Sequence, residues 1–380
     1  MDISFMGYAM KSANIQLGRI YGIKIGVDYS WFVVFVLITM SLSTQYATLH
    51  PQWSPTTHVL VGIVTSLLFF VTVLLHEMGH SVVAIQKGIP VRSITLFIFG
   101  GVAQIAREPK RAVDEFWIAV AGPVVSFVIA IACMLGSVAM KPISGVANAV
   151  LTWLGQINLV LALFNLIPGF PLDGGRILRA ILWGWKGDFK SATRTASGVG
   201  QFVAYSFIFA GVITALRGNF FNGLWIGFIG WFLLNAAQTS YRHAALKQSL
   251  AGLTVRDVMS TDCPVVSGSI PLSEFVHDEV LRTGQRCFLV TQFDKLVGII
   301  TLHEVKQIPQ AEWNSTPVAT AMQPLDHLHM VHPSDPLVGI LEKMTTEGFN
   351  QLPVVEEEKL VGILGRDRLL QLIQTRLELG

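Results

Sequence analysis

Apolar residues divide the chain into two parts with different patterns. Residues 1–245 hold long apolar runs, whereas residues 250–380 hold short runs mixed with charged residues. Six of the long runs reach the roughly 20 residues that a membrane-spanning helix needs; they cover about 29–48, 57–86, 113–140, 146–168, 197–216 and 220–240. The pattern predicts an α-helical integral membrane protein with about six transmembrane helices, followed by a domain outside the bilayer.

Composition supports a lipid bilayer as the surroundings of the first part. Hydrophobic residues make up 52% of the chain and charged residues only 14%, against about 25% charged residues in ordinary soluble domains. A wholly soluble protein is therefore excluded. The net charge of +2 gives no general attraction to nucleic acid, so no nucleic-acid partner is expected.

The loop charges orient the predicted spans. With the N-terminus inside, fifteen Lys and Arg residues outside the spans fall on the inner side, and only Lys141 and Arg217 fall on the outer side. Positively charged loops stay in the cytoplasm. We expect a multi-pass protein of the cell (inner or plasma) membrane, with both termini in the cytoplasm.

The second span carries the motif His76-Glu77-Met78-Gly79-His80. Residues i and i+4 share one face of a helix, so both imidazoles can reach the same ion. This HExxH pattern is a zinc-binding signature in which the glutamate acts as the general base. Ionisable groups are costly within an apolar span and are usually functional, which favours a metal site over a pair of histidines that only bond neighbouring helices.

A third metal ligand is expected after the fourth span, where the chain reads Asn165-Leu-Ile-Pro-Gly-Phe-Pro-Leu-Asp173-Gly-Gly-Arg. Zinc in catalytic sites takes three protein ligands. The Pro and Gly residues interrupt a regular helix, and a broken backbone at membrane depth requires protein or a water-filled cavity around it. Asp173 is therefore expected to point into such a cavity; the alternative is that its carboxylate caps a helix over residues 174–185.

Together these motifs resemble the site-2 protease family of intramembrane zinc metalloproteases, and the similarity extends over most of residues 14–190. The segments NIQLGRIYGIKIGVDYSW (14–31), FIFGGVA (97–103) and AGPVVS (121–126) resemble the family's first strand and helix entry, its membrane-associated β-hairpin and its small-residue packing motif. The family commonly has His where this chain has Asp28. The resemblance implies one Zn²⁺ bound by His76, His80 and Asp173, with Glu77 as the catalytic base and Asn165 assisting at the substrate carbonyl. It also implies a transmembrane protein as substrate.

The pattern of residues 91–106, VRSITLFIFGGVAQIA, predicts a β-hairpin in which Gly100-Gly101 interrupts the run of strand-forming residues. A transmembrane helix hides its carbonyls in its own hydrogen bonds, so a substrate must be unwound before it is cut. The edge of this hairpin can hold an extended substrate by strand addition. The alternative is a re-entrant lid without substrate contact. Asp114 and Glu115 lie at the start of the third span. They are expected to stabilise the N-terminus of that helix rather than to bind metal.

The C-terminal part contains an internal repeat with an offset of 63 to 64 residues. Val255-Arg-Asp-Val-Met259 pairs with Val318-Ala-Thr-Ala-Met322, and Lys295-Leu-Val-Gly-Ile299 pairs with Lys359-Leu-Val-Gly-Ile363. Two such copies resemble a tandem CBS pair of α/β fold. We expect a transmembrane metalloprotease domain over 1–248 and CBS repeats over 253–308 and 315–376.

The CBS resemblance implies an adenine nucleotide, held by Thr301 and Asp367, and a homodimer formed through these domains. The first copy has His303 where the family has Asp, and the second has Gly365 where the family has Thr or Ser. A purely structural or dimerising module is therefore the alternative to a nucleotide-binding one.

The motifs predict an intramembrane zinc endopeptidase that cuts transmembrane proteins near the cytoplasmic side, with the CBS pair as its regulatory module. Two other functions stay open at this point: a CBS-regulated transporter or channel, and a catalytically inactive homologue that binds membrane helices. Transport does not need a base one residue after a ligand, and the complete set of His76, Glu77, His80 and Asp173 argues against an inactive homologue.

Overall fold

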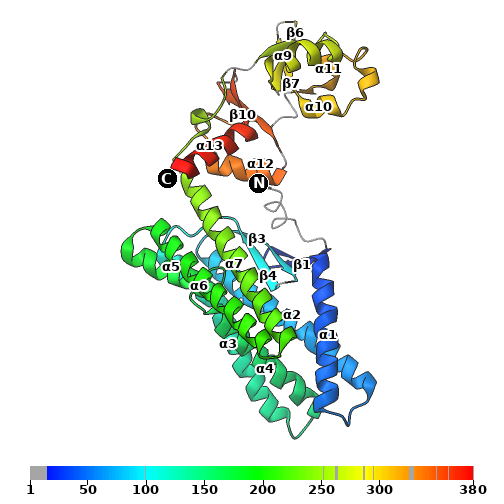
Figure 1. The fold of residues 1–380 in the computed structure, drawn as a ribbon, viewed down its shortest axis with the longest axis vertical. Coiled ribbons are helices and arrows are strands. Elements are labelled where there is room, and N and C mark those ends of the chain that lie inside the picture. The colour runs from blue at the N-terminus through cyan, green and yellow to red at the C-terminus, as the bar shows by residue number, and fades with distance from the viewer. Residues whose placement is uncertain are drawn as a thin grey trace. The chain divides into compact units, whose positions relative to one another are not determined.

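The computed structural model describes residues 15–379, except 99, 251, 262, 263, 286, 294, 325–328, 348 and 358. The chain forms two compact units, Met1–Ala245 and Leu246–Gly380. The first is built around long helices and one small sheet, and the second around short helices and strands (Figure 1).

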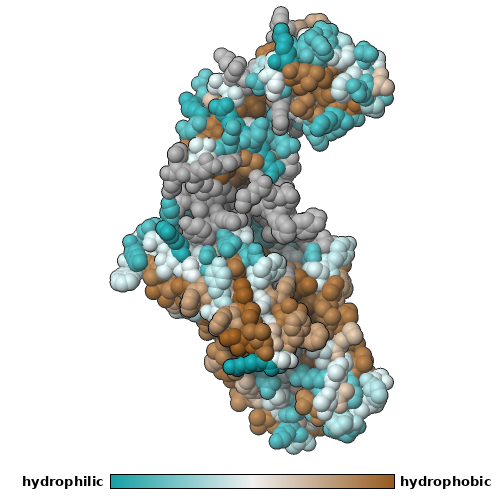
Figure 2. All heavy atoms as spheres, in the orientation of Figure 1, coloured by the Kyte–Doolittle hydropathy of each residue, from teal (hydrophilic) through white to brown (hydrophobic). Residues whose placement is uncertain are grey.

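The described part of the first unit contains six helices that are long and apolar enough to cross a membrane, which confirms the predicted number. They are α1 (Tyr29–Leu49), α2 (Pro55–Gln86), α3 (Ala112–Met140), α4 (Gly145–Asn165), α6 (Phe189–Leu216) and α7 (Phe220–Ser249). Large apolar side chains on these helices are exposed, as Figure 2 shows in brown. Continuous apolar surfaces of this kind mark a membrane contact.

Some helix ends differ from the predicted spans. Helix α6 begins at Phe189, eight residues before the span predicted at 197, because the Asp188 carboxylate accepts a hydrogen bond from the Lys190 backbone and caps its start. Helix α4 ends at Asn165, before the predicted end at 168. An apolar run marks only the part of a helix that suits lipid, so a helix with a polar first turn, such as α6, extends beyond it. Helix α4 is shorter than its apolar run because Pro168 disfavours helical backbone in the residue before it.

A four-stranded sheet joins two segments that are distant in sequence. Its order is β1 (Ile15–Ile20), β2 (Ile23–Val27), β3 (Val91–Phe97) and β4 (Gly100–Ile105). The hairpin expected over 91–106 is present as β3 and β4, and β3 pairs in parallel with β2. Strand β4 lies at the end of this order, so its outer edge has no strand partner in the described sheet.

A bend over residues 166–172 leads from α4 to the shorter helix α5 (Asp173–Lys186). The bend packs closely on α6: the Phe170 amide donates to the Ala196 carbonyl over 3.3 Å. A Cβ added at Gly200 would lie 2.1 Å from the Phe170 carbonyl oxygen. Small residues on α6 therefore hold the bend in place.

The second unit consists of two similar α/β halves. The first contains β5 (Val265–Ser267), β6 (Cys287–Gln292), β7 (Lys295–Thr301), α8 (Leu272–Glu274), α9 (Leu281–Thr283) and α10 (Leu302–Lys306). The second contains α11 (Val318–Ala321), β8 (Gln323–Pro324), α12 (Leu337–Glu347), β9 (Gln351–Glu356), β10 (Lys359–Gly365) and α13 (Arg366–Leu379).

The two halves exchange their opening segments. Val255 and Val258, which begin the first sequence repeat, are buried in a core formed by residues 331–373 of the second. Val318, which begins the second repeat, is buried in the core of the first with Val266 and Phe288. Strand β8 likewise pairs with β7 of the first half. Neither sequence repeat therefore buries its core alone.

Candidate metal centre

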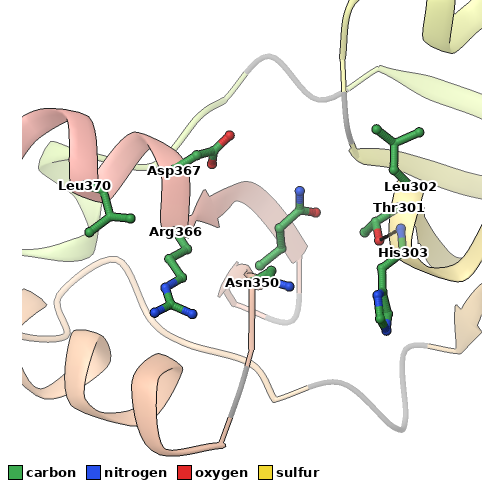
Figure 3. A pocket seen from close by; sticks show the side chains of 8 residues that line it. Thr301, Leu302, His303, Asn350, Arg366, Asp367 and Leu370 are labelled. Atoms are coloured by element: carbon green, nitrogen blue, oxygen red, sulfur yellow. Dashed lines mark hydrogen bonds between the residues drawn. The ribbon is translucent and has the colours of Figure 1, made fainter. Parts of the chain in front are cut away.

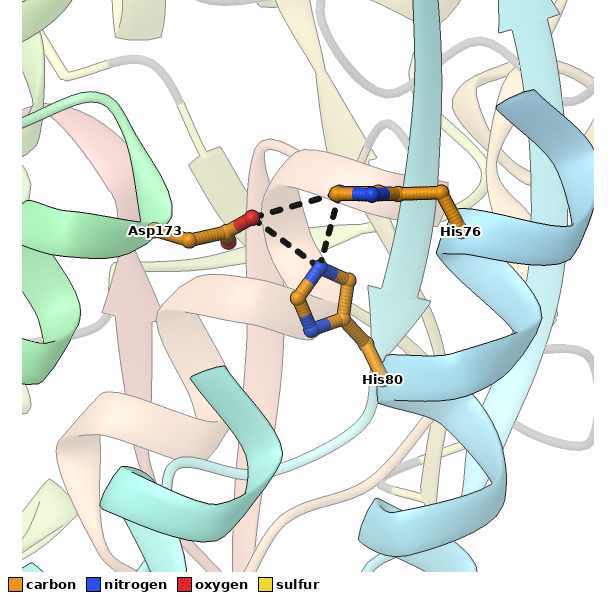
Figure 4. A group of neighbouring side chains, drawn as sticks. All are labelled: His76, His80 and Asp173. Atoms are coloured by element: carbon orange, nitrogen blue, oxygen red, sulfur yellow. Dashed lines mark hydrogen bonds and ion pairs between the residues drawn. The ribbon is translucent and has the colours of Figure 1, made fainter. Parts of the chain in front are cut away.

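Three side chains from two helices converge inside the first unit: His76 and His80 from α2, and Asp173 from the first turn of α5 (Figure 4). The Nε2 atoms of the two imidazoles are 3.2 Å apart, and each lies 3.2 Å from Asp173 Oδ2. Both histidines are buried, with 4% of their surface exposed. The three potential ligand atoms thus form an equilateral triangle.

This triangle fits a zinc ion. Tetrahedral zinc with bonds of 2.0–2.1 Å separates its ligand atoms by about 3.3 Å, close to the three observed distances. Two imidazoles and one carboxylate are also ligands that zinc accepts, with the fourth position left to water or substrate. The donor set and its spacing therefore suit one catalytic zinc ion.

Hydrogen bonds at the opposite side of each ring direct both Nε2 atoms to the centre. His80 Nδ1 donates to the carbonyl of Ile118 over 2.6 Å, and His76 Nδ1 lies 2.9 Å from Ser126 Oγ. A carbonyl can only accept, so the proton of neutral His80 sits on Nδ1 and the lone pair on Nε2. Such outer partners of ligating histidines fix the ring orientation and raise metal affinity.

Helix α3 approaches the two imidazoles through a glycine. A Cβ added at Gly122 would lie 2.1 Å from His80 Nε2 and 2.7 Å from His76 Nε2. Real Cβ atoms do not come so close, so any larger residue at 122 would displace the rings. The AGPVVS segment thus supplies both this glycine and Ser126.

Asp173 does not cap its own helix. The N-cap of α5 is Leu172, without a side-chain hydrogen bond, while the Asp173 carboxylate turns to the histidines. The Asp173 side chain thus points to the same centre as the two imidazoles and offers a carboxylate oxygen as the third ligand.

Glu77 lies beside the cluster and against strand β4. It is half-buried, and a Cβ added at Gly101 would lie 2.5 Å from Glu77 Cγ and 3.3 Å from Oε1. The backbone of Ala103, two residues further along β4, also lies near the same carboxylate. The outer strand of the sheet and the carboxylate of the motif therefore lie in direct contact.

Asn165 is the last residue of α4 and is half-buried, directly before the bend that leads to Asp173. It is separated from Asp173 only by residues 166–172, which include the buried Gly169 and Phe170. The bend thus connects the two residues that the sequence singled out, Asn165 at the end of α4 and Asp173 at the start of α5.

In the second unit, Thr301 and Asp367 line one open cavity of about 420 Å³. Figure 3 shows Thr301 and His303 on one side of it, and Arg366 and Asp367 on the other. Thr301 Oγ also serves α10 as its N-cap, since it accepts a hydrogen bond from the His303 amide. Thr301 in the first repeat and Asp367 in the second, the two residues that match the CBS family pattern, therefore line the same cavity.

Sequence reasoning missed the outer partners of the metal centre. Ser126 and Ile118 contact the imidazoles, and Glu115 forms a buried ion pair with Arg179 of α5. Glu115 was expected only to favour the start of a helix. Glu115 precedes Ile118, Gly122 and Ser126 by three, seven and eleven residues, so all four lie on one face of the helix. This spacing was the sequence signal that could have identified them as one buried face.

Family models match both parts of the chain. The model of peptidase family M50 matches residues 64–144 and 143–211, and the CBS domain model matches 255–309 and 318–375. The zinc metalloprotease sll0528 of Synechocystis sp. is 35% identical over 379 residues, covering 99% of both chains. Rip3 of Mycobacterium tuberculosis, also named a zinc metalloprotease, is 33% identical over 94% of this chain and 92% of its own.

Among solved structures, the site-2 protease from Methanocaldococcus jannaschii is 31% identical and covers 60% of this chain and 94% of its own, with a TM-score of 0.43. The similarity to sll0528 extends over nearly the whole chain, so it includes the HExxH helix, the bend with Asp173 and the C-terminal repeats. The chain therefore belongs to the site-2 protease family of metalloproteases, peptidase family M50, and carries two CBS domains.

Proposed function

We propose that the protein is a zinc-dependent endopeptidase that cuts transmembrane proteins near the cytoplasmic face of the membrane. The observation that carries this proposal is the triangle of His76, His80 and Asp173 with Glu77 beside it, inside a bundle of membrane-spanning helices. A transporter has no use for a base adjacent to three metal ligands.

Each residue of the site has a distinct role in this proposal. His76, His80 and Asp173 hold the ion, which when bound polarises the scissile carbonyl and makes water more acidic. Glu77 accepts the proton of the attacking water and delivers it to the leaving amine. The Asn165 amide donates a hydrogen bond to the carbonyl oxygen as negative charge develops there.

The depth of the site suits cleavage close to the inner surface. His76 precedes Lys87, the C-cap of α2, by eleven residues, which corresponds to roughly 16 Å along the helix axis. The cut would then fall in the cytoplasmic half of the bilayer.

Strand β4 is suited to present the substrate. Its outer edge has no strand partner in the described sheet, and it contacts Glu77 at Gly101. An unwound segment can add to such an edge as a further strand. Its carbonyls would then lie next to the proposed base.

The test is the variant Glu77→Gln, which removes the base but none of the three ligands. We expect zinc content equal to that of the wild type, and cleavage of a co-expressed single-span substrate reduced by at least about a hundredfold. Mass spectrometry of the purified protein measures zinc, and the substrate fragment is followed on immunoblots. Unchanged cleavage by Glu77→Gln would show that this site is not the protease site, and a wild-type protein without cleavage would identify an inactive homologue.

We also propose that the CBS pair binds an adenine nucleotide and regulates the protease. The support is the cavity in which Thr301 and Asp367 lie together with Arg366 and His303. Arg366 offers a positive charge for phosphate oxygens, and an exposed carboxylate such as Asp367 can accept hydrogen bonds from ribose hydroxyls.

Calorimetry of the full chain with ATP, ADP and AMP tests nucleotide binding. We expect at least one of them to bind, and Asp367→Ala to weaken that binding by about tenfold, the loss expected for one or two hydrogen bonds. Asp278→Ala is the matched control, because Asp278 is an exposed carboxylate of the same unit that contacts His277. If none of the three nucleotides releases or absorbs heat, the CBS pair is a structural or dimerising module.

The expected homodimer is tested separately, by light scattering of the solubilised chain. A purely monomeric protein would contradict it.

A further inference from the structure

One face of α3 contacts all the parts that carry metal ligands. Glu115, Ile118, Gly122 and Ser126 follow one another along this face, and each is buried. Ser126 bonds the ring of His76, Ile118 bonds the ring of His80, and Gly122 lies against both rings. Glu115 is the remaining member, and its partner lies on the helix that carries Asp173.

Glu115 and Arg179 form an ion pair in the interior. Arg179 Nε donates to Glu115 Oε1 over 2.8 Å, and Nη2 donates to the same oxygen. Glu115 is 0% and Arg179 8% exposed. Arg179 lies in α5, six residues after Asp173, so the pair ties the helix of the third ligand to the helix that orients the first two.

The guanidinium of Arg179 also clamps the bend before Asp173. Its Cζ lies 4.9 Å from the centre of the Phe170 ring and 4.7 Å from that of Phe189. Phe170 belongs to the bend, and Phe189 is the first residue of α6. A planar guanidinium can stack on two rings and form hydrogen bonds at its edge at the same time.

The pair is poorly suited to a purely stabilising role. Both charges are desolvated, and Glu115 Oε2 has no hydrogen-bond partner among the described residues. Buried ion pairs with unsatisfied atoms are often no more stable than apolar side chains of similar volume. What such apolar residues would not reproduce is the directional link between α3, the bend and α5.

We propose that Arg179, held by Glu115, is a positioning residue that sets Asp173 against the two histidines, so that the buried face of α3 places all three metal ligands. The inference rests on the proposed zinc site. It predicts that loss of the pair weakens metal retention even where the fold is kept.

The main test is the double variant Glu115→Leu/Arg179→Met, which removes both charges without leaving one unpaired. We expect thermal unfolding like that of the wild type, but zinc release to a chelator about tenfold faster or more, within the range seen when outer partners of metal ligands are lost. We also expect a fall in kcat that exceeds any change in KM. Zinc release as slow as in the wild type would overturn the proposal.

Arg179→Lys gives a second readout if the double variant does not fold. Lysine keeps the charge opposite Glu115 but offers neither the fork nor the flat surface between the two rings, so faster zinc release is again expected and unchanged release would contradict the proposal. Lys87→Met/Asp114→Asn is the matched control, because it removes a half-exposed ion pair that also involves the first turn of α3 and should leave zinc release unchanged. A wild-type protein without zinc would instead refute the proposed function itself.

Discussion

The space for the metal centre depends on a residue that has no side chain. Gly122 lies in van der Waals contact with both imidazoles, and the first carbon of any side chain there would fall 2.1 Å from His80 Nε2. Buried ligands move little because protein interiors are close-packed. A single methyl group at this position should therefore remove the site while leaving all its ligands in the sequence.

We predict that Gly122→Ala loses most of its zinc because the added methyl group occupies the place of the ligand atoms. Zinc content measured by mass spectrometry should fall well below stoichiometric, and cleavage should fall with it. Gly136→Ala is the control on the same helix: its Cβ would meet only the end of the Leu151 side chain, at 3.3 Å. Full zinc occupancy in Gly122→Ala would show that the rings can move aside.

Single elements were predictable where a local pattern defines them. Apolar runs located all six spans, since lipid contact requires about 20 apolar residues in one helix. The hairpin of β3 and β4 followed from β-branched residues around a Gly-Gly pair. The parallel pairing of β2 with β3 was not predictable from the pattern, because the register between distant strands depends on how the helices between them pack.

At the level of the strand, we predict that Gly101→Ala lowers cleavage without loss of zinc. The new Cβ would press on the Glu77 side chain, which must turn away from the attacking water, whereas the three ligands are untouched. We expect a loss of about tenfold or more, but less than removal of the base causes. Gly145→Ala, where a Cβ meets nothing within 4 Å, should behave as the wild type; equal activity of both variants would mean that β4 does not constrain Glu77.

For the whole molecule, the distribution of Lys and Arg predicts that both termini lie in the cytoplasm. Only Lys141 and Arg217 would lie outside, and positive loops resist translocation. A protease added to inside-out vesicles should digest the CBS unit, and the same protease added to right-side-out vesicles should not. A tag inserted next to Lys141 is the control with the opposite accessibility, and digestion of the CBS unit from the outer side would reverse the assignment.

Much of this protein is determined by its sequence alone. The spans, the HExxH turn, the interrupted helix before Asp173 and the repeat of 63 to 64 residues are each contained in short segments. The length of the spans follows from the apolar solvent, and the shared face of the two histidines follows from helix geometry. The family and the candidate ligands could therefore be predicted before any contact was known.

Only the tertiary structure determined which of these segments contact one another. Contacts across 50, 64 and 97 residues join Ser126 to His76, Arg179 to Glu115 and Asp173 to His76. The exchange of opening segments between the CBS halves, which buries Val255 in one core and Val318 in the other, is of the same kind. A local pattern shows which face of an element is buried but not against what, because the partner is chosen by close packing of the whole unit.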